Sequence, residues 1–130
     1  MSRSVAEWLE GYRVAWVERD PDAVAELFTE DARYVEQPYQ EPFIGREGVR
    51  DYWTRVTATQ ADIHVRYGTA VISGHRAAVE WWVTMTNGGQ DVTLAGEFFL
   101  TFDEHGACSE LREYWHFAEG RVEPPEGWGQ

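Results

Sequence analysis

The spacing of apolar residues changes once along this chain, at about residue 62, and this change limits the fold more than any other feature of the sequence. Before residue 62, apolar residues recur with the 3.6-residue period of amphipathic helices. After it, apolar and polar residues alternate, which is typical of strands with one buried face. Helices followed by a run of strands predict an α+β fold, with the helices packed on one face of a curved antiparallel sheet.

Helix-start signals divide the first half of the chain. Ser4 and Glu7 form a capping box and predict a first helix that runs to about Arg19. Asp20 as N-cap, with Pro21 at the first helical position, predicts a short second helix. The other elements expected here are a strand over residues 32–37, a loop over residues 38–45 and a third helix from about residue 46.

Four strands fit the alternating second half. They are separated by turns rich in Gly, Asn and Asp, which favour hairpins. Residues 120–130 contain Pro and Gly and predict an irregular tail. No repeat and no linker divides the chain, so residues 1–130 are expected to form a single domain. The expected strands cover about 62–73, 76–87, 91–103 and 107–118.

The charge and the missing motifs exclude several classes of function. The formal net charge is -12. Because such an anionic surface repels nucleic acid and acidic lipid, neither is expected as a partner. No run of 18 apolar residues is present to span a membrane. The polar start of the chain indicates no signal peptide and Cys108 is the only cysteine, which together favour a cytoplasmic location. No metal-binding or phosphate-binding motif occurs, so neither a metal nor a cofactor is expected.

Aromatic residues make up 15% of the chain and include seven tryptophans. Trp and Tyr combine a large apolar area with one polar group, which suits pockets and interfaces. The two periodicities direct many of these rings inward and predict one apolar pocket. Its titratable members are expected to be Tyr12, Tyr34, Glu36 and Glu113. The residues expected to contact a ligand are Trp16, Tyr34, Trp53, Trp81, Val83, Phe98 and Trp115.

Three parts of the chain carry a family resemblance: Leu27-Phe28-Thr29-Glu30-Asp31-Ala32, then Pro42-Phe43-Ile44-Gly45-Arg46-Glu47-Gly48-Val49, and finally Phe102-Asp103-Glu104-His105-Gly106 with Leu111-Arg112-Glu113-Tyr114-Trp115. They resemble the nuclear transport factor 2-like superfamily, most of all its SnoaL-like and ketosteroid-isomerase-like branch. The resemblance covers about residues 5–117. It implies a cone-shaped domain, in which three helices pack on the concave face of a curved mixed sheet and enclose an apolar pocket.

The resemblance also implies roles for single residues. Aligned without a gap, Tyr12 falls where ketosteroid isomerases keep their oxyanion-stabilising tyrosine, and Glu36 falls where they keep their carboxylate base. Phe98 takes the place of their second oxyanion donor, so one donor is expected to be missing. A shift by one residue would instead place Gln37 at the base position.

These residues suggest acid–base chemistry. Ionising a carboxyl group in an apolar wall is costly, so the pKa of such a group is expected to rise towards neutrality, where proton transfer is most effective. Our hypothesis is that Glu36 removes a proton from the carbon beside a substrate carbonyl while Tyr12 donates a hydrogen bond to the oxygen. A protonated Glu113 would partly replace the missing donor.

Three functions fit the sequence. The first is an isomerase, cyclase or dehydratase that acts without a cofactor on a small apolar carbonyl compound, polyketide-like or steroid-like. The second is a non-catalytic module that binds such a molecule. The third is an accessory protein that uses the fold for dimerisation. Large aromatic residues at outward strand positions, together with the family resemblance, predict a homodimer formed through the outer face of the sheet.

Overall fold

The structure, a computed structural model, describes residues 3–130, so residues 1 and 2 of the polar start lie outside the described residues. The chain forms three helices and a seven-stranded sheet, which confirms the α+β class. The elements are α1 (Val5–Val17), α2 (Pro21–Ala25), β1 (Phe28–Val35), β2 (Phe43–Ile44), α3 (Gly45–Thr57), β3 (Gln60–Tyr67), β4 (Val71–Ser73), β5 (Arg76–Asn87), β6 (Gln90–Phe102) and β7 (Cys108–Glu119).

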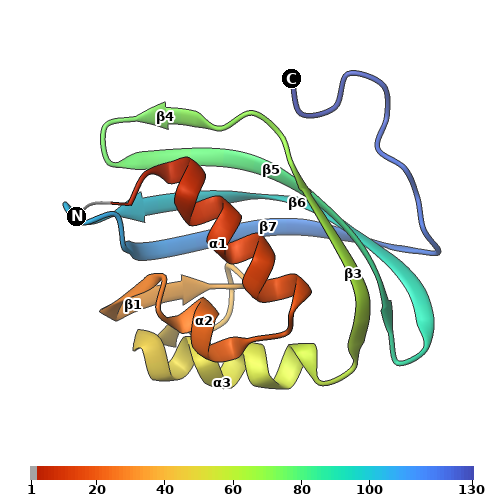
Figure 1. Cartoon of the computed structure of the whole chain (residues 1–130), viewed down its shortest axis with the longest axis horizontal. Coiled ribbons are helices and arrows are strands. Elements are labelled where there is room, and N and C mark those ends of the chain that lie inside the picture. Colours follow the sequence, from red (N-terminus) through yellow and green to blue (C-terminus); the bar gives the residue numbers. More distant parts are fainter. Residues whose placement is uncertain (1–2) are drawn as a thin grey trace.

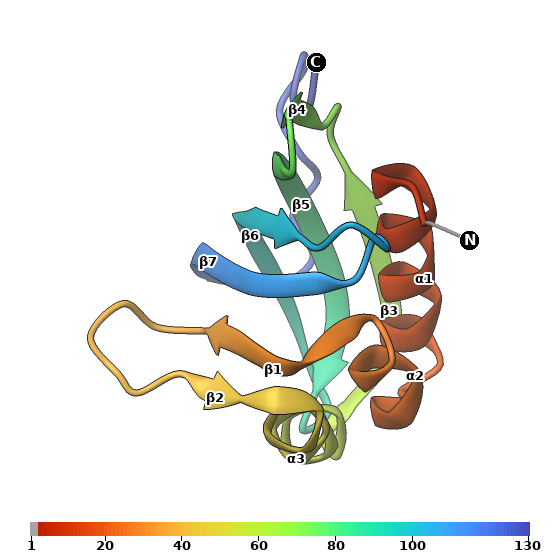
Figure 2. The same ribbon diagram turned by 90° about the vertical axis from the view of Figure 1, so that its left-hand side faces the viewer.

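The strands lie in the order β2-β1-β7-β6-β5-β3, and β4 pairs with β5. The β1–β7 pair is parallel and the other pairs are antiparallel. Helix α1 crosses one face of the sheet (Figure 1), and the turned view shows α1 and α2 on that side of the curved strands (Figure 2). Helix α3 packs against α2 and β1. We call the face that the helices cover the inner face and the other the outer face.

The predicted helix starts are confirmed. Ser4 Oγ accepts a hydrogen bond from the Glu7 backbone N–H at 3.1 Å, and Glu7 Oε1 accepts one from the Ser4 N–H at 3.0 Å. Asp20 accepts one from the Ala23 N–H, with Pro21 as the first residue of α2. These bonds satisfy N–H groups that the first turn of a helix leaves free. Helix α1 ends at Val17, two residues before the expected end.

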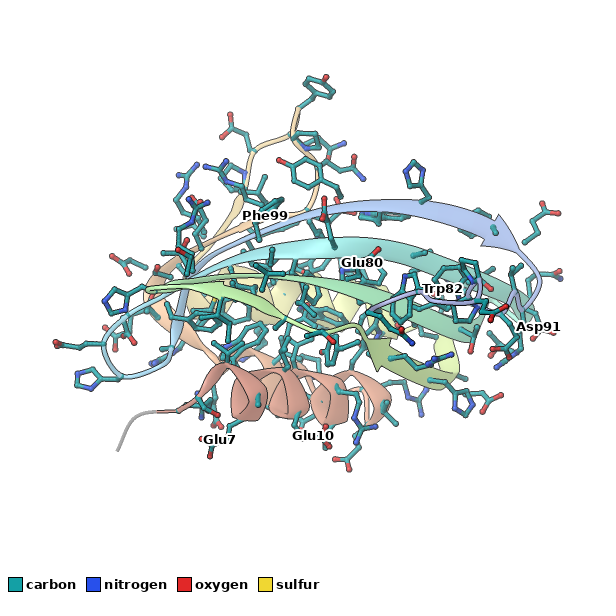
Figure 3. The ribbon with its side chains drawn as sticks, turned by 90° about the horizontal axis from the view of Figure 1, so that it is seen from above. Glu7, Glu10, Glu80, Trp82, Asp91 and Phe99 are labelled. Carbon is teal, nitrogen blue, oxygen red and sulfur yellow. The ribbon has the colours of Figure 1, made fainter. Side chains whose placement is uncertain are left out.

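The alternation predicted for the long strands is regular along β5. It is interrupted in β6, where Val92 and Thr93 are both buried, and late in β7, where His116 and Phe117 are both exposed. Every second residue of β5 from Ala77 to Met85 is buried, and the residues between them are more exposed. The adjacent residues Trp81 and Trp82 therefore lie on opposite faces. In Figure 3, Glu7 and Glu10 point away from the sheet along α1, whereas Glu80, Trp82 and Phe99 lie on the other side of the molecule.

Two predicted boundaries were wrong in the first half of the chain. The first strand begins at Phe28 and ends at Val35, rather than covering residues 32–37, because Phe28 already pairs with Cys108 of β7. Residues 38–45, expected to form only a loop, include the short strand β2, which pairs with Arg33 and Tyr34 of β1.

The strand predicted over residues 62–73 is divided into β3 and β4. At the break, a Cβ atom on Gly68 would lie only 2.7 Å from the Gly129 Cα atom, so the two backbones are in close contact. The Thr69 N–H donates to the Gly129 carbonyl at 2.7 Å. Residues 68–70 therefore bind the end of the chain instead of continuing the strand.

Residues 120–130, which we call the C-terminal strap, form no helix or strand but are held against the outer face. The Trp82 indole N–H donates to the Val122 carbonyl at 2.8 Å. The ring of Trp128 lies edge-on to the ring of Trp82, with centroids 5.6 Å apart, and the Arg66 guanidinium lies over Trp128 at 5.7 Å. The strap thus covers one part of the outer face.

Candidate functional site

A cavity of about 260 Å³ lies on the inner face, between the sheet and the helices α1 and α3. Most of its wall is aromatic or aliphatic. The lining residues are Tyr12, Trp16, Tyr34, Glu36, Tyr52, Trp53, Val56, Thr59, Gln60, Trp81, Asn87, Val92, Leu94, Glu113, Trp115 and Phe117.

Helix and strand periods bring these side chains together. Tyr12 and Trp16 are four residues apart on α1 and therefore lie on one helix face. Glu113, Trp115 and Phe117 alternate along β7 and point to the same side of the sheet. The register places Trp115 opposite Gly96, and a Cβ atom there would lie 2.7 Å from the Trp115 Cβ atom. Position 96 therefore requires glycine.

A chain of hydrogen bonds connects the cavity's buried polar groups. The hydroxyl groups of Tyr12 and Tyr34 lie 3.0 Å apart, and the Tyr34 hydroxyl donates to Glu113 Oε1 at 2.7 Å. Tyr12 is fully buried, and Tyr34 and Glu113 are 1% and 7% exposed. The three groups come from α1, β1 and β7, so the assembled fold alone brings them together.

Burial raises the pKa values of the three groups in this hydrogen-bond chain. Loss of solvation raises the pKa of Glu113 to about 8, and the nearby Glu36 carboxylate adds to the rise, while the hydrogen bond from Tyr34 opposes it. Burial, together with the negative charge of Glu113, also raises the pKa of Tyr12 and Tyr34 well above the ordinary value. At neutral pH Glu113 is therefore mainly protonated, and both tyrosines keep their protons.

Glu36 also lines the cavity, in a more open place than Glu113. It directly follows β1 and is half-buried, and the Gln37 amide donates weakly to its Oε1 at 3.4 Å. Glu36, Pro38 and Glu113 also line a smaller groove beside β7. Past the Val35–Arg112 pair, β1 no longer pairs with β7, so this edge of the cavity lies near the surface.

A polar contact that the sequence did not indicate lies beyond Trp16. The Trp16 indole N–H donates to Gln60 Oε1 at 2.9 Å, and Gln60 is 6% exposed. Gln60 opens β3 directly opposite Asn87 of β5. Nearby, the Thr59 hydroxyl donates to Asn87 Oδ1 at 2.6 Å, which connects the end of α3 to the β5–β6 hairpin.

The sequence model of the SnoaL-like domain matches residues 5–111. The chain belongs to the SnoaL-like family. A search of curated protein sequences finds no match.

Solved structures show the same fold as this SnoaL-like chain. A protein of ketosteroid isomerase-like fold from Catenulispora acidiphila, in complex with trimethylamine, is 20% identical with a TM-score of 0.75 over 85% of this chain and 86% of that one. SalBIII, an epoxide hydrolase/cyclase-like enzyme in pyran ring formation of the polyether salinomycin, is 22% identical (TM-score 0.72; 85% and 89%). A candidate scytalone dehydratase from Novosphingobium aromaticivorans is 13% identical (TM-score 0.79; 98% and 93%).

The structure of this SnoaL-like chain brings most of the predicted site residues together. The expected titratable residues Tyr12, Tyr34, Glu36 and Glu113 all line the cavity, as do Trp16, Trp53, Trp81 and Trp115. Two predicted contact residues do not line it. Val83 is fully buried in the core, and Phe98 packs edge-on against Tyr12, with ring centroids 5.4 Å apart.

Sequence reasoning missed several lining residues of the SnoaL-like domain. Tyr52 of α3 lines the cavity but is not among the residues that the sequence predicted there. Gln60 and Asn87 carry no sequence signal, because their place at the cavity depends on the pairing of β3 with β5. Among residues 3–130, no group of three or more His, Cys, Asp or Glu side chains could hold a metal ion, and no helix is long and apolar enough to cross a membrane.

Proposed function

We propose that this chain binds a small, largely apolar carbonyl compound in the cavity and carries out acid–base chemistry on it, of the isomerase, cyclase or dehydratase type. The observation that carries the proposal is the unbroken hydrogen-bond chain from Tyr12 through Tyr34 to the buried carboxyl group of Glu113. Membership of the SnoaL-like family and structural similarity to a cyclase-like enzyme support it.

The protonation state of Glu113 decides which group donates and which accepts along these hydrogen bonds. A protonated Glu113 can donate to Tyr34, which frees the Tyr34 hydroxyl to donate to Tyr12 and the Tyr12 hydroxyl to donate to a ligand oxygen. When Glu113 ionises, its carboxylate can only accept, so Tyr34 donates to it in the direction described above and Tyr12 donates to Tyr34. Tyr12 then has no proton left for the ligand. Protonated Glu113 thus makes Tyr12 a hydrogen-bond donor towards the cavity.

Glu36 supplies the base in this scheme. Its carboxylate takes a proton from the carbon next to the carbonyl group, the C–H electron pair forms the carbon–carbon double bond of an enolate, and Tyr12 stabilises the negative oxygen. Glu36 then returns the proton to carbon. Because Glu36 is half-buried at the open edge of the cavity, this proton can exchange with water before it returns to the carbon.

Exchange of carbon-bound hydrogen tests the proposal without knowledge of the natural substrate. With trans-1-decalone in D₂O, the wild type is expected to speed deuterium incorporation next to the carbonyl, measured by mass spectrometry. Glu36→Gln is expected to lower this rate by about 10²–10⁴-fold, and Tyr12→Phe by about 10²–10³-fold. Gln37→Leu is the control for the neighbouring position. Decalone that binds without any exchange would instead identify a non-catalytic binding protein.

The pH profile tests the role of Glu113 separately. Because the pKa of Glu113 is about 8, wild-type exchange is expected to fall as the pH rises through that value. In Glu113→Gln the amide NH₂ donates to Tyr34 at every pH, so activity is expected to persist above pH 8. The same loss of activity in both proteins would contradict the directional chain.

A further inference from the structure

The amide group of Gln60 has a fixed orientation at the cavity wall. An indole N–H can only donate a hydrogen bond, so the Gln60 atom that lies 2.9 Å from Trp16 Nε1 must be the amide oxygen. The contact therefore settles which end of the amide is which. The NH₂ end points away from Trp16.

This NH₂ group has no hydrogen-bond partner among the described residues, although Gln60 is 6% exposed and lines the cavity. It differs from the indole nitrogens of Trp53 and Trp81, which also lack partners but are themselves buried out of reach. The Gln60 amide nitrogen is not among these inaccessible atoms, so it is accessible, and Gln60 lines the cavity. An accessible amide NH₂ without a protein partner, on a residue of the cavity wall, can donate a hydrogen bond to an acceptor of a bound molecule.

The open donor lies along the same wall as Tyr12. Tyr12 and Trp16 are neighbours on one face of α1, with ring centroids 6.2 Å apart, and Gln60 follows Trp16. Tyr12 and Gln60 therefore both contact Trp16, and all three residues line the cavity.

We propose that the Gln60 NH₂ group donates a hydrogen bond to a second oxygen acceptor of the bound molecule, which makes Gln60 a specificity-determining residue. This inference rests on the proposed function and sharpens its substrate class. The ligand is an apolar cyclic compound with two oxygen acceptors, one received by Tyr12 and the other by Gln60. A compound with one acceptor leaves one of the donors unpaired.

Two probes with the same ring body test this inference. They are trans-1-decalone, with one carbonyl oxygen, and trans-decalin-1,5-dione, with two. We expect the wild type to bind the dione about three- to tenfold more tightly than the decalone, which is the contribution of one neutral hydrogen bond. In Gln60→Leu this preference is expected to vanish, because the donor for the second oxygen is gone. Isothermal titration calorimetry gives both affinities.

A second variant covers the case in which Gln60→Leu does not fold. Gln60→Glu keeps an oxygen for the Trp16 N–H but replaces the donor by an acceptor, so the dione is expected to bind more weakly than the decalone. Gln40→Leu, a change of an exposed glutamine in the β1–β2 loop, is the matched control and should keep the wild-type preference. The Gln60 side-chain NH₂ signal in a ¹H–¹⁵N spectrum should shift with the dione.

The outcomes separate the two proposals. Binding of both probes with equal preference in wild type and Gln60→Leu would overturn the role of Gln60 and leave the proposed function in place. Failure of both probes to bind the wild type would overturn the proposed function, and the role of Gln60 with it. Binding of the decalone alone would overturn only the role of Gln60. A preference for the dione that is present in the wild type and lost in Gln60→Leu supports both proposals.

Discussion

The two faces of the same sheet differ in how they treat the same kinds of residue. On the inner face, Trp81 is 1% exposed and Glu113 is buried in a hydrogen-bond chain. On the outer face, the adjacent Trp82 stays partly accessible under the strap. Glu80 and Glu97 lie opposite each other there without an ion pair among the described residues. The inner face joins Tyr12, Tyr34 and Glu113 in one hydrogen-bond chain, whereas the outer face leaves charged side chains in contact with water.

This difference shows what the two-residue period of a strand decides. Adjacent positions on a strand place their side chains on the buried cavity wall and on the exposed surface in turn. The residue type alone therefore does not fix the role of a side chain. A tryptophan stabilises the core in one case and holds the strap in the other. The following tests measure how far the two faces are independent.

The largest expected contrast is between two neighbouring tryptophans. Trp81→Ala removes a buried ring and is expected to lower the free energy of unfolding by about 3–5 kcal/mol. Trp82→Ala removes a partly exposed ring and one hydrogen bond to the strap, and is expected to cost about 1–2 kcal/mol. Urea unfolding monitored by circular dichroism measures both values. Equal losses would show that the strap side is as much a part of the core as the cavity side.

The next effect is a pH dependence that belongs to the inner face. The folded chain holds the Glu113 proton up to a pKa of about 8, whereas the unfolded chain releases it near the ordinary value of 4.5. Between these values the unfolded state binds fewer protons, so the stabilising contribution present below pH 4.5 is lost as the pH rises towards 8. From pH 5.5 to 7.5, the free energy of unfolding of the wild type is expected to fall by about 2.5 kcal/mol relative to that of Glu113→Gln. If the free energy of unfolding depended on pH in the same way in both proteins, a buried proton at Glu113 would be ruled out.

A smaller effect is expected from the strap. Trp128→Ala removes the edge-on contact with Trp82 and the stacking of Arg66, and is expected to cost about 0.5–1.5 kcal/mol. Hydrogen exchange of the Trp82 indole N–H should become faster, because its bond to Val122 loosens. The Trp16 indole N–H, bonded to Gln60 inside, is the internal control and should not change. Faster exchange at both sites would mean that the two faces are coupled.

The smallest effect on stability is expected on the uncovered part of the outer face. Phe99 and Tyr114 are 39% and 44% exposed and form an edge-on ring pair at 6.3 Å. If this surface forms the proposed homodimer, light scattering should show a dimer for wild type and a monomer for Phe99→Asp. The monomer's free energy of unfolding should change by less than about 0.5 kcal/mol. Val71→Asp, at an exposed apolar site on β4, should remain dimeric. A monomeric wild type at micromolar concentration would reject the interface.

Local signals in the sequence predicted the parts of the fold that depend on neighbouring residues. The Ser4–Glu7 capping box and the β5–β6 turn at residues 88–89 are each predicted by residues that lie within a few positions of one another in the sequence. The alternation along β5 is likewise a local pattern, and it correctly separated Trp81 from Trp82. These features need no knowledge of distant partners.

These local patterns could not predict contacts between segments that are distant in the sequence. The split between β3 and β4 depends on Gly68 meeting Gly129, sixty-one positions later in the sequence. The place of Gln60 depends on Trp16 and on the pairing with β5. For the site, alternation predicted that Glu113 and Tyr34 face inward. It did not predict that they bond to each other and to Tyr12, because that requires three elements in their final arrangement.

The parallel pairing of β1 with β7 has a consequence for the order in which the molecule can assemble. Residues 28–35 are made early in synthesis, but the strand that separates them from β6 begins only at Cys108. Until then Phe28 and Tyr34 have no neighbour on that side, and closing so long a loop is slow. The same strand carries Glu113. A nascent chain that stops before residue 108 therefore lacks both the seam of the sheet and the acid of the cavity, so docking of β7 completes the fold and the chemistry in one step.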